Sequence, residues 1–144
     1  MCKSVKSKSV IFFMLLLVVS AISVVNASAN NSDTPWSYSC QSASSYTEYR
    51  EKENTSYVYC QPESGHATYV TVEGAYNYYG SGNGEYSGRH YIGINVPAFI
   101  SNYVNENSRG YARLHLERTV SDNTLCTGVW SPDSVWQSNA VYFY

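Results

Sequence analysis

The aliphatic residues of this chain are concentrated in one short stretch near its N-terminus, and this uneven distribution limits what the remainder can fold into. Residues 10–25 are almost continuously apolar, interrupted only by Ser20 and Ser23. Three lysines precede the stretch, and an Ala-x-Ala sequence at Ala27 and Ala29 follows it. A basic head, an apolar segment and small residues at its end are typical of a secretory signal peptide. The two serines make a stable membrane span less favourable, so we expect residues 1–29 to be cleaved.

Cleavage leaves residues 30–144 as a single secreted domain and changes the charge of the chain. Three of the nine basic residues lie in residues 1–29, whereas all 11 acidic residues remain, so the formal net charge becomes −5. Nucleic acids and anionic lipid surfaces attract clustered basic residues, and this domain has only six, which are scattered. We therefore expect no nucleic acid as a partner, no membrane span after cleavage, and a location outside the cell or at its surface.

The composition of residues 30–144 favours strands and aromatic packing. Ile, Leu, Val and Phe number only 17 in these 115 residues, but all 15 tyrosines and all three tryptophans lie there. Tyrosine and tryptophan are strong strand formers that bury large areas. The sequence therefore predicts an ordered β-rich domain with an aromatic core that includes Trp36 and Trp130.

Alternating apolar and polar residues predict about seven short strands separated by turns. Such a pattern indicates an all-β fold, a small antiparallel β-sandwich or barrel. Residues 74–88 contain five glycines and predict a long loop or a bulged hairpin. Residues 98–107 have apolar residues at helical spacing and predict one short helix or an irregular crossover. The expected strands are residues 36–40, 57–60, 67–74, 90–96, 110–118, 125–130 and 140–144.

Three cysteines remain after cleavage, namely Cys40, Cys60 and Cys126. An exported protein meets oxidising surroundings, where a disulfide can form. A Cys40–Cys60 disulfide would close the shortest loop and is one expectation, and three buried thiols without a bridge are the other. The three histidines are far apart in the sequence from one another and from the cysteines, so we expect no metal site and no cofactor.

Catalytic motifs are missing from the sequence. The glycine run at residues 80–84 matches neither a dinucleotide fingerprint nor a phosphate-binding loop. A pair of carboxylates for glycoside hydrolysis would have to come from among Glu48, Glu73, Glu85 and Glu117, but outward-facing strand positions explain these charges better. We therefore expect a protein that is not an enzyme.

The tyrosines of the glycine-rich segment are the candidate binding residues. Exposed tyrosines stack on sugar rings and anchor protein interfaces at low entropic cost. Tyr78 and Tyr79 are consecutive, so on a strand at least one of them would lie outside the core. The candidate binding surface consists of Tyr76, Tyr78, Tyr79 and Tyr86, and its expected partner is a cell-wall glycan or another extracellular protein.

Two stretches have a distinctive sequence. Residues 99–114 contain Phe-Ile-Ser-Asn-Tyr-Val-Asn-Glu followed by Tyr-Ala-Arg-Leu, and residues 128–135 contain Trp-Ser-Pro-Asp-Ser. Both resemble small secreted proteins of Gram-positive bacteria whose domain has no known function. A weaker likeness, in the aromatic tail at residues 141–144, is to lactococcin-972-type bacteriocins. The resemblance implies secretion and a β fold. It implies no catalytic residues and no known ligand.

These observations lead to one expected function and one alternative. The expected function is non-enzymatic binding at the cell envelope or outside the cell through the tyrosine- and glycine-rich surface. The alternative is an exported, bacteriocin-like antagonistic polypeptide, which would inhibit the growth of related strains.

Overall fold

The computed structural model describes residues 30–144, so the predicted signal segment lies outside the described residues. Residues 30–144 contain eleven strands and no helix, which confirms the all-β prediction. Several strands have only two or three residues, which is why the alternation in the sequence predicts fewer of them. The strands are β1 (Thr34–Ser39), β2 (Ser44–Tyr46), β3 (Arg50–Glu51), β4 (Val58–Ser64), β5 (Thr68–Ala75), β6 (Gly84–Glu85), β7 (His90–Ile92), β8 (Ala98–Ile100), β9 (Tyr111–Arg118), β10 (Leu125–Ser131) and β11 (Val141–Phe143).

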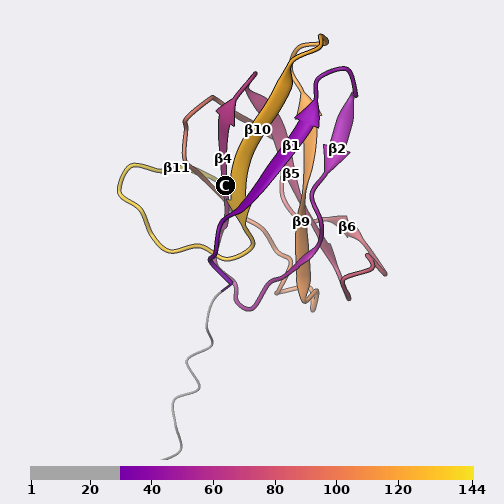
Figure 1. The fold of residues 1–144 in the computed structure, drawn as a ribbon. Helices are drawn as coiled ribbons and strands as arrows, with labels where there is room; N and C mark the ends of the chain where they lie inside the picture. Colours follow the sequence, from indigo (N-terminus) through magenta and orange to yellow (C-terminus); the bar gives the residue numbers. More distant parts are fainter. Residues whose placement is uncertain (1–29) are drawn as a thin grey trace, which may run out of the picture.

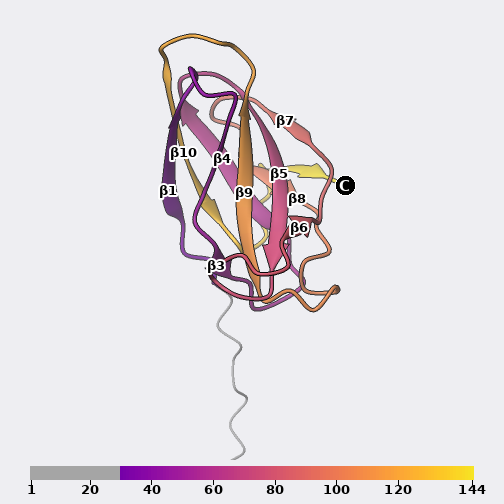
Figure 2. The ribbon, with the colours of Figure 1, turned by 90° about the vertical axis from the view of Figure 1, so that its right-hand side faces the viewer.

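The strands form two sheets that pack against each other as a β-sandwich. Sheet A has the order β1-β10-β4-β8-β11, and sheet B has the order β2-β9-β5-β6, with β3 paired to β9 and β7 paired to β5. Figure 1 shows β1, β10 and β4 side by side, and Figure 2 shows β9 next to β5. The pairs are antiparallel except for β11, which runs parallel to β8.

The core lies between the two sheets because apolar residues alternate with polar ones along the longer strands. In β9, Ala112, Leu114 and Leu116 are buried, whereas Arg113 and His115 between them are partly exposed. The burial of alternate residues is the signature of a strand with one face toward the core. Sheet A supplies larger rings, and the predicted aromatic core is confirmed: the buried rings of this sheet include Trp36, Tyr38 and Trp130.

The prediction of a helix within residues 98–107 is wrong, and the irregular crossover is what the structure shows. Residues 98–100 form β8 in the interior of sheet A, and all three are buried, so apolar residues at helical spacing here reflect a fully buried strand. Asn102 then ends the strand, because its side chain donates to Ile100 O and accepts from Val104 N. Such local side-chain bonds compete with helix formation.

A buried carboxylate at Asp133 joins three separate parts of the chain. Lys52 Nζ donates to Asp133 Oδ1 at 3.1 Å, and both side chains are fully buried. Oδ2 accepts hydrogen bonds from the backbone N of Asn30 at 3.0 Å and of Glu53 at 2.9 Å. The Trp-Ser-Pro-Asp-Ser motif therefore has a structural role, which is to hold the start of the domain and the segment after β3 against the end of β10.

The cysteine that Cys40 contacts is Cys126. The two Sγ atoms are 2.8 Å apart, and both residues are fully buried. Cys60 is equally buried but lies in β4, where its register partners are Trp130 and Ala98. All three are free thiols in this structure. The neighbouring cysteines are therefore Cys40 and Cys126, and not the expected pair of Cys40 and Cys60. The reason is that antiparallel pairing of β1 with β10 brings together residues that are distant in the sequence.

Candidate functional site

The loop between β5 and β6, residues 76–83, projects tyrosine side chains into solvent, and we call it the tyrosine hairpin. Tyr76, Tyr78 and Tyr79 are 56%, 50% and 92% exposed. Tyr78 and Tyr79 lie in a turn, so the alternation of a strand does not apply, and both rings are outside the core. Their rings contact each other edge to face with centroids 5.8 Å apart. The structure therefore brings three of the four candidate tyrosines to one exposed loop.

The fourth candidate, Tyr86, has a different position. It is only partly exposed and packs against the hydrophobic core. A Cβ atom at Gly74 would lie 2.9 Å from the Tyr86 ring, so the absence of a side chain at that position leaves room for the ring. Tyr86 thus packs against the core and does not project from the hairpin as the other three rings do.

Two glycines with positive φ shape the hairpin. Gly80 has a φ of 80° and Gly82 a φ of 63°, conformations that residues with a Cβ adopt only at a cost. A Cβ at Gly82 would lie 2.5 Å from Cε2 of Tyr76, and a Cβ at Gly80 would lie 2.9 Å from Cε2 of the buried Tyr49. The glycines therefore allow both the turn and the close approach of the rings.

Side-chain contacts hold the hairpin in one conformation. Asn77 Oδ1 accepts hydrogen bonds from the backbone N of Tyr79 at 3.0 Å and of Ser81 at 3.2 Å. The guanidinium of Arg109 lies over the Tyr76 ring, 3.6 Å from its centroid, and 5.6 Å from that of Tyr86. A loop fixed in this way loses little conformational entropy when it binds a partner.

Glu48 fixes the second exposed ring. The Tyr78 hydroxyl donates to Glu48 Oε2 at 3.2 Å. This hydrogen bond and the charge of Glu48 raise the pKa of Tyr78 above its ordinary value. The Tyr78 ring is therefore held in one orientation by Glu48, whereas no such contact holds the hydroxyl of Tyr79 among the described residues.

An open cleft of about 410 Å³ lies next to β6, whose Glu85 is part of its lining. The cleft lies between residues 85–88 and the turn that follows β8. A hydrogen bond from Tyr103 N to Tyr86 O, at 2.9 Å, links these two segments. Tyr103 is 63% exposed and was not among the predicted binding residues. The volume is within the range of small-ligand sites, and the lining combines rings with carboxylate, hydroxyl and amide groups. The lining residues are Glu85, Tyr86, Ser87, Gly88, Tyr103 and Asn107.

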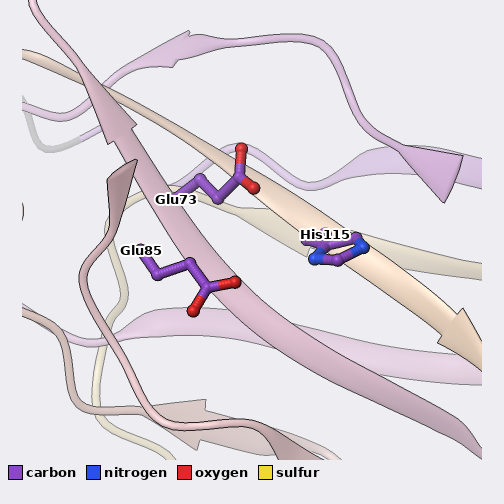
Figure 3. Close-up of side chains that lie close together, drawn as sticks. All are labelled: Glu73, Glu85 and His115. Carbon is purple, nitrogen blue, oxygen red and sulfur yellow. The ribbon is translucent and has the colours of Figure 1, made fainter. Parts of the chain in front are cut away.

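Glu85 also belongs to a cluster with Glu73 and His115 at the base of the hairpin. The register of β5 and β6 places Glu73 directly opposite Glu85, and β9 adds His115 (Figure 3). One ligand atom of each residue lies within 4.8 Å of the others. Of the four glutamates considered for catalysis, the sheet thus brings together Glu73 and Glu85.

Arg113 and Tyr46 each contact one member of this cluster. Arg113 Nε and Nη2 both lie 2.7 Å from Glu73 Oε2, so one carboxylate already has a cationic partner. The His115 ring stacks on Tyr46 with centroids 4.5 Å apart and an angle of 13° between the planes. Carboxylate oxygens and imidazole nitrogens are ligands that divalent metal ions bind. Among the residues that the structure describes, these three are the ones placed to hold such an ion. The ion pair with Arg113 opposes that use.

Sequence reasoning missed the arginines and one exposed aromatic residue. Arg109 and Arg113 are far from the glycine-rich segment in the sequence. In the fold, Arg109 lies over Tyr76 and Tyr86, whereas Arg113 lies over Tyr46 and Tyr49 and pairs with Glu73. Trp136 is 74% exposed in the loop between β10 and β11, which protrudes at one side in Figure 1. The surrounding serine, glutamine and asparagine residues were the available signal for its exposure.

Fold and site together define a β-sandwich domain with an exposed, pre-organised tyrosine hairpin beside an open cleft. The chain belongs to the family described as a protein of unknown function (DUF2712), whose family model matches residues 23–134. The expected membership of an uncharacterised domain is thereby confirmed, while the likeness to bacteriocins stays a prediction. No curated protein and no solved structure gives a significant match to the chain. No helix in residues 30–144 is long and apolar enough to cross a membrane.

Proposed function

We propose that this protein is exported and that it binds a glycan of the cell envelope through the tyrosine hairpin and the adjoining cleft. The observation that carries the proposal is the exposure of Tyr76, Tyr78 and Tyr79 on one rigid loop. Monomeric proteins rarely gather exposed apolar groups into one contiguous patch unless the patch serves an interaction, and these three rings share one loop. The predicted signal peptide in residues 1–29 is the reason to look for the partner outside the cell.

The chemistry of the surface favours a sugar. The C–H faces of a pyranose ring pack on an aromatic ring, and the sugar hydroxyls need donors and acceptors nearby. The cleft offers both, with Tyr103 beside Glu85 and Asn107. A protein partner would use the same rings as anchors, and it is the alternative outcome of the test.

Binding without catalysis is supported by the state of three of the four candidate carboxylates. Glu73 is held by Arg113, Glu48 accepts from Tyr78, and Glu117 accepts from Arg89 in an ion pair. A hydrolase needs one carboxylic acid that can donate a proton, and a carboxylate in an ion pair with arginine is poorly suited to this. Our proposal therefore assigns Glu73 to the support of the hairpin.

The test is retention of the purified protein on insoluble peptidoglycan, compared with a panel of other polysaccharides. We expect the wild-type protein to be retained and the Tyr79→Ser variant to bind about tenfold more weakly, the usual effect of removing one anchoring ring. Tyr79 is almost fully exposed, so its replacement leaves the fold intact. Trp136→Ser is the matched control, because it removes another exposed ring, 74% exposed, at a different place.

Three results would contradict the proposal. They are equal retention of wild type and Tyr79→Ser, loss of retention only in Trp136→Ser, and no retention on any glycan. Capture of the protein by an extracellular polypeptide, with the same dependence on Tyr79, would replace the glycan by a protein partner. Intact mass of the protein from culture medium tests export, and a mass equal to that of residues 30–144 is expected.

A further inference from the structure

Two of the three cysteines in residues 30–144 are placed for covalent bonding. Cys40 Sγ and Cys126 Sγ are 2.8 Å apart, closer than thiols need to be for packing alone. The backbones are also fixed: β1 pairs with β10, with Tyr38 opposite Cys126, and Cys40 N donates to Thr124 O at 2.9 Å. Since the strands determine these positions, the thiols meet without any rearrangement of the fold.

The location of the pair gives it a structural consequence. β1 is an edge strand of sheet A and is paired to β10 alone. The two cysteines are 86 residues apart, and the segment between them contains every strand of sheet B. A covalent bond here would fasten the edge strand and close a long loop, and long loops are those whose closure restricts the unfolded chain most.

We propose that Cys40 and Cys126 form a disulfide in the exported protein and that Cys60 stays a free thiol. The proposal rests on the export half of the proposed function, because a disulfide persists only in oxidising surroundings. The oxidant is a disulfide, either of an exported thiol oxidoreductase or of oxidised glutathione. One cysteine thiolate attacks this disulfide and releases one thiolate of the oxidant. The other cysteine then attacks the mixed disulfide, so two thiols lose two protons and two electrons and the oxidant becomes two thiols.

Burial determines when this reaction takes place. Both cysteines are fully buried, so an oxidant cannot reach them in the folded domain. Burial and the neighbouring Cys126 thiol also raise the pKa of Cys40 to about 12, which leaves little of the reactive thiolate. The bond therefore forms while the chain is unfolded or partly folded during export. Once formed, it resists reductants until the domain unfolds.

The first test uses the wild-type full chain and needs no variant. The protein purified from culture medium is expected to have a mass lower by two hydrogen atoms than after unfolding in the presence of a reductant. Alkylation before and after reduction, followed by peptide mapping, should show one labelled cysteine at Cys60 and a linked pair at Cys40 and Cys126. Three alkylated thiols in the exported, unfolded but unreduced protein would overturn the proposal, as would a linkage that involves Cys60.

The second test separates the disulfide from export and from glycan binding. The chain, reduced and unfolded in urea, is refolded in a mixture of reduced and oxidised glutathione. We expect the Cys60→Ala variant to regain the linkage, and the Cys126→Ala variant to remain unlinked with a melting temperature lower by about 10 to 20 °C. An unlinked Cys60→Ala protein that folds would overturn the proposal. Peptidoglycan retention plays no part in either readout, so the disulfide and the proposed function can fail separately.

Discussion

Replacement of Asp133 by asparagine should cost the domain a large part of its stability, because it removes one half of a buried ion pair. Lys52 and Asp133 are both fully buried, and Lys52 Nζ has two further acceptors, the carbonyl oxygens of Ser56 at 2.7 Å and Pro132 at 2.9 Å. Neutral carbonyls do not compensate for the charge. In Asp133→Asn the ammonium group is therefore left in the interior without an anion.

Asp133 and Lys52 have different surroundings, so we expect replacement of Asp133 to lower the free energy of unfolding more than replacement of Lys52. Asp133 accepts backbone N–H groups of Asn30, Glu53 and Asn54 in addition to Lys52, whereas Asp133 is the one anion in contact with Lys52 among the described residues. Breaking a buried pair by removing one partner costs about 3–5 kcal/mol, and we expect this for Asp133→Asn. For Lys52→Met we expect about 2 kcal/mol, because three N–H donors still stabilise the carboxylate.

Urea unfolding followed by tryptophan fluorescence measures both free energies of unfolding. Burial lowers the pKa of Lys52 in the folded protein, and the Asp133 charge opposes that shift. Without Asp133 the pKa of Lys52 falls further, so the unfolded state binds more protons between this pKa and 10.5. The difference in free energy of unfolding between the wild type and Asp133→Asn should therefore become smaller as the pH rises from 7 toward 10. A deficit below about 1 kcal/mol, or one smaller than that of Lys52→Met, would refute this reasoning.

Three further predictions concern the outer face of sheet B, the hairpin and alkaline pH. Arg113→Met should lower the free energy of unfolding by about 1–3 kcal/mol, and Glu73→Gln in the same chain should restore part of it; a double-mutant cycle with no coupling would contradict this. Gly82→Ala should cost about 1 kcal/mol in urea unfolding and weaken peptidoglycan retention, since a Cβ displaces the Tyr76 ring; unchanged retention would contradict the supporting role of the glycine. Burial raises the pKa values of Tyr38 and Tyr49 above 10.0, so the stability they contribute is complete below pH 10 and is lost as the pH rises above it. Unfolding monitored by circular dichroism from pH 8 to 12 checks this, and constant stability would contradict it.

Local patterns in the sequence were enough to predict the strands with one buried face. In β9, polar and apolar residues alternate cleanly, and the apolar residues Ala112, Leu114 and Leu116 are the buried ones. In β5 the outward-facing Thr71 and Glu73 are buried as well, which alternation in the sequence does not predict. Residues 98–107 show where such reasoning fails. β8 lies between β4 and β11 and is buried at all three positions, so its sequence lacks the alternation that identifies a strand.

The candidate site was predictable in its tyrosines and not in its partners. A glycine-rich segment with clustered tyrosines is a local signal, and it located three exposed rings. Arg109 over Tyr76, and Arg113 and His115 beside Glu73, come from distant parts of the chain, and their positions depend on which strands pair and in which register. The cysteines illustrate the same limit, because loop length in the sequence favoured Cys60 whereas the register of β1 and β10 places Cys126 beside Cys40.

The central claim is that the tyrosine hairpin and its cleft are the binding surface, and NMR titration tests it most directly. An isotope-labelled sample of residues 30–144 would be titrated with soluble peptidoglycan fragments while backbone and aromatic signals are followed. We predict chemical-shift changes confined to residues 76–88 and 103–109, with the largest at the rings of Tyr78 and Tyr79. Changes centred on residues 132–144, or none at saturating fragment concentrations, would contradict the claim.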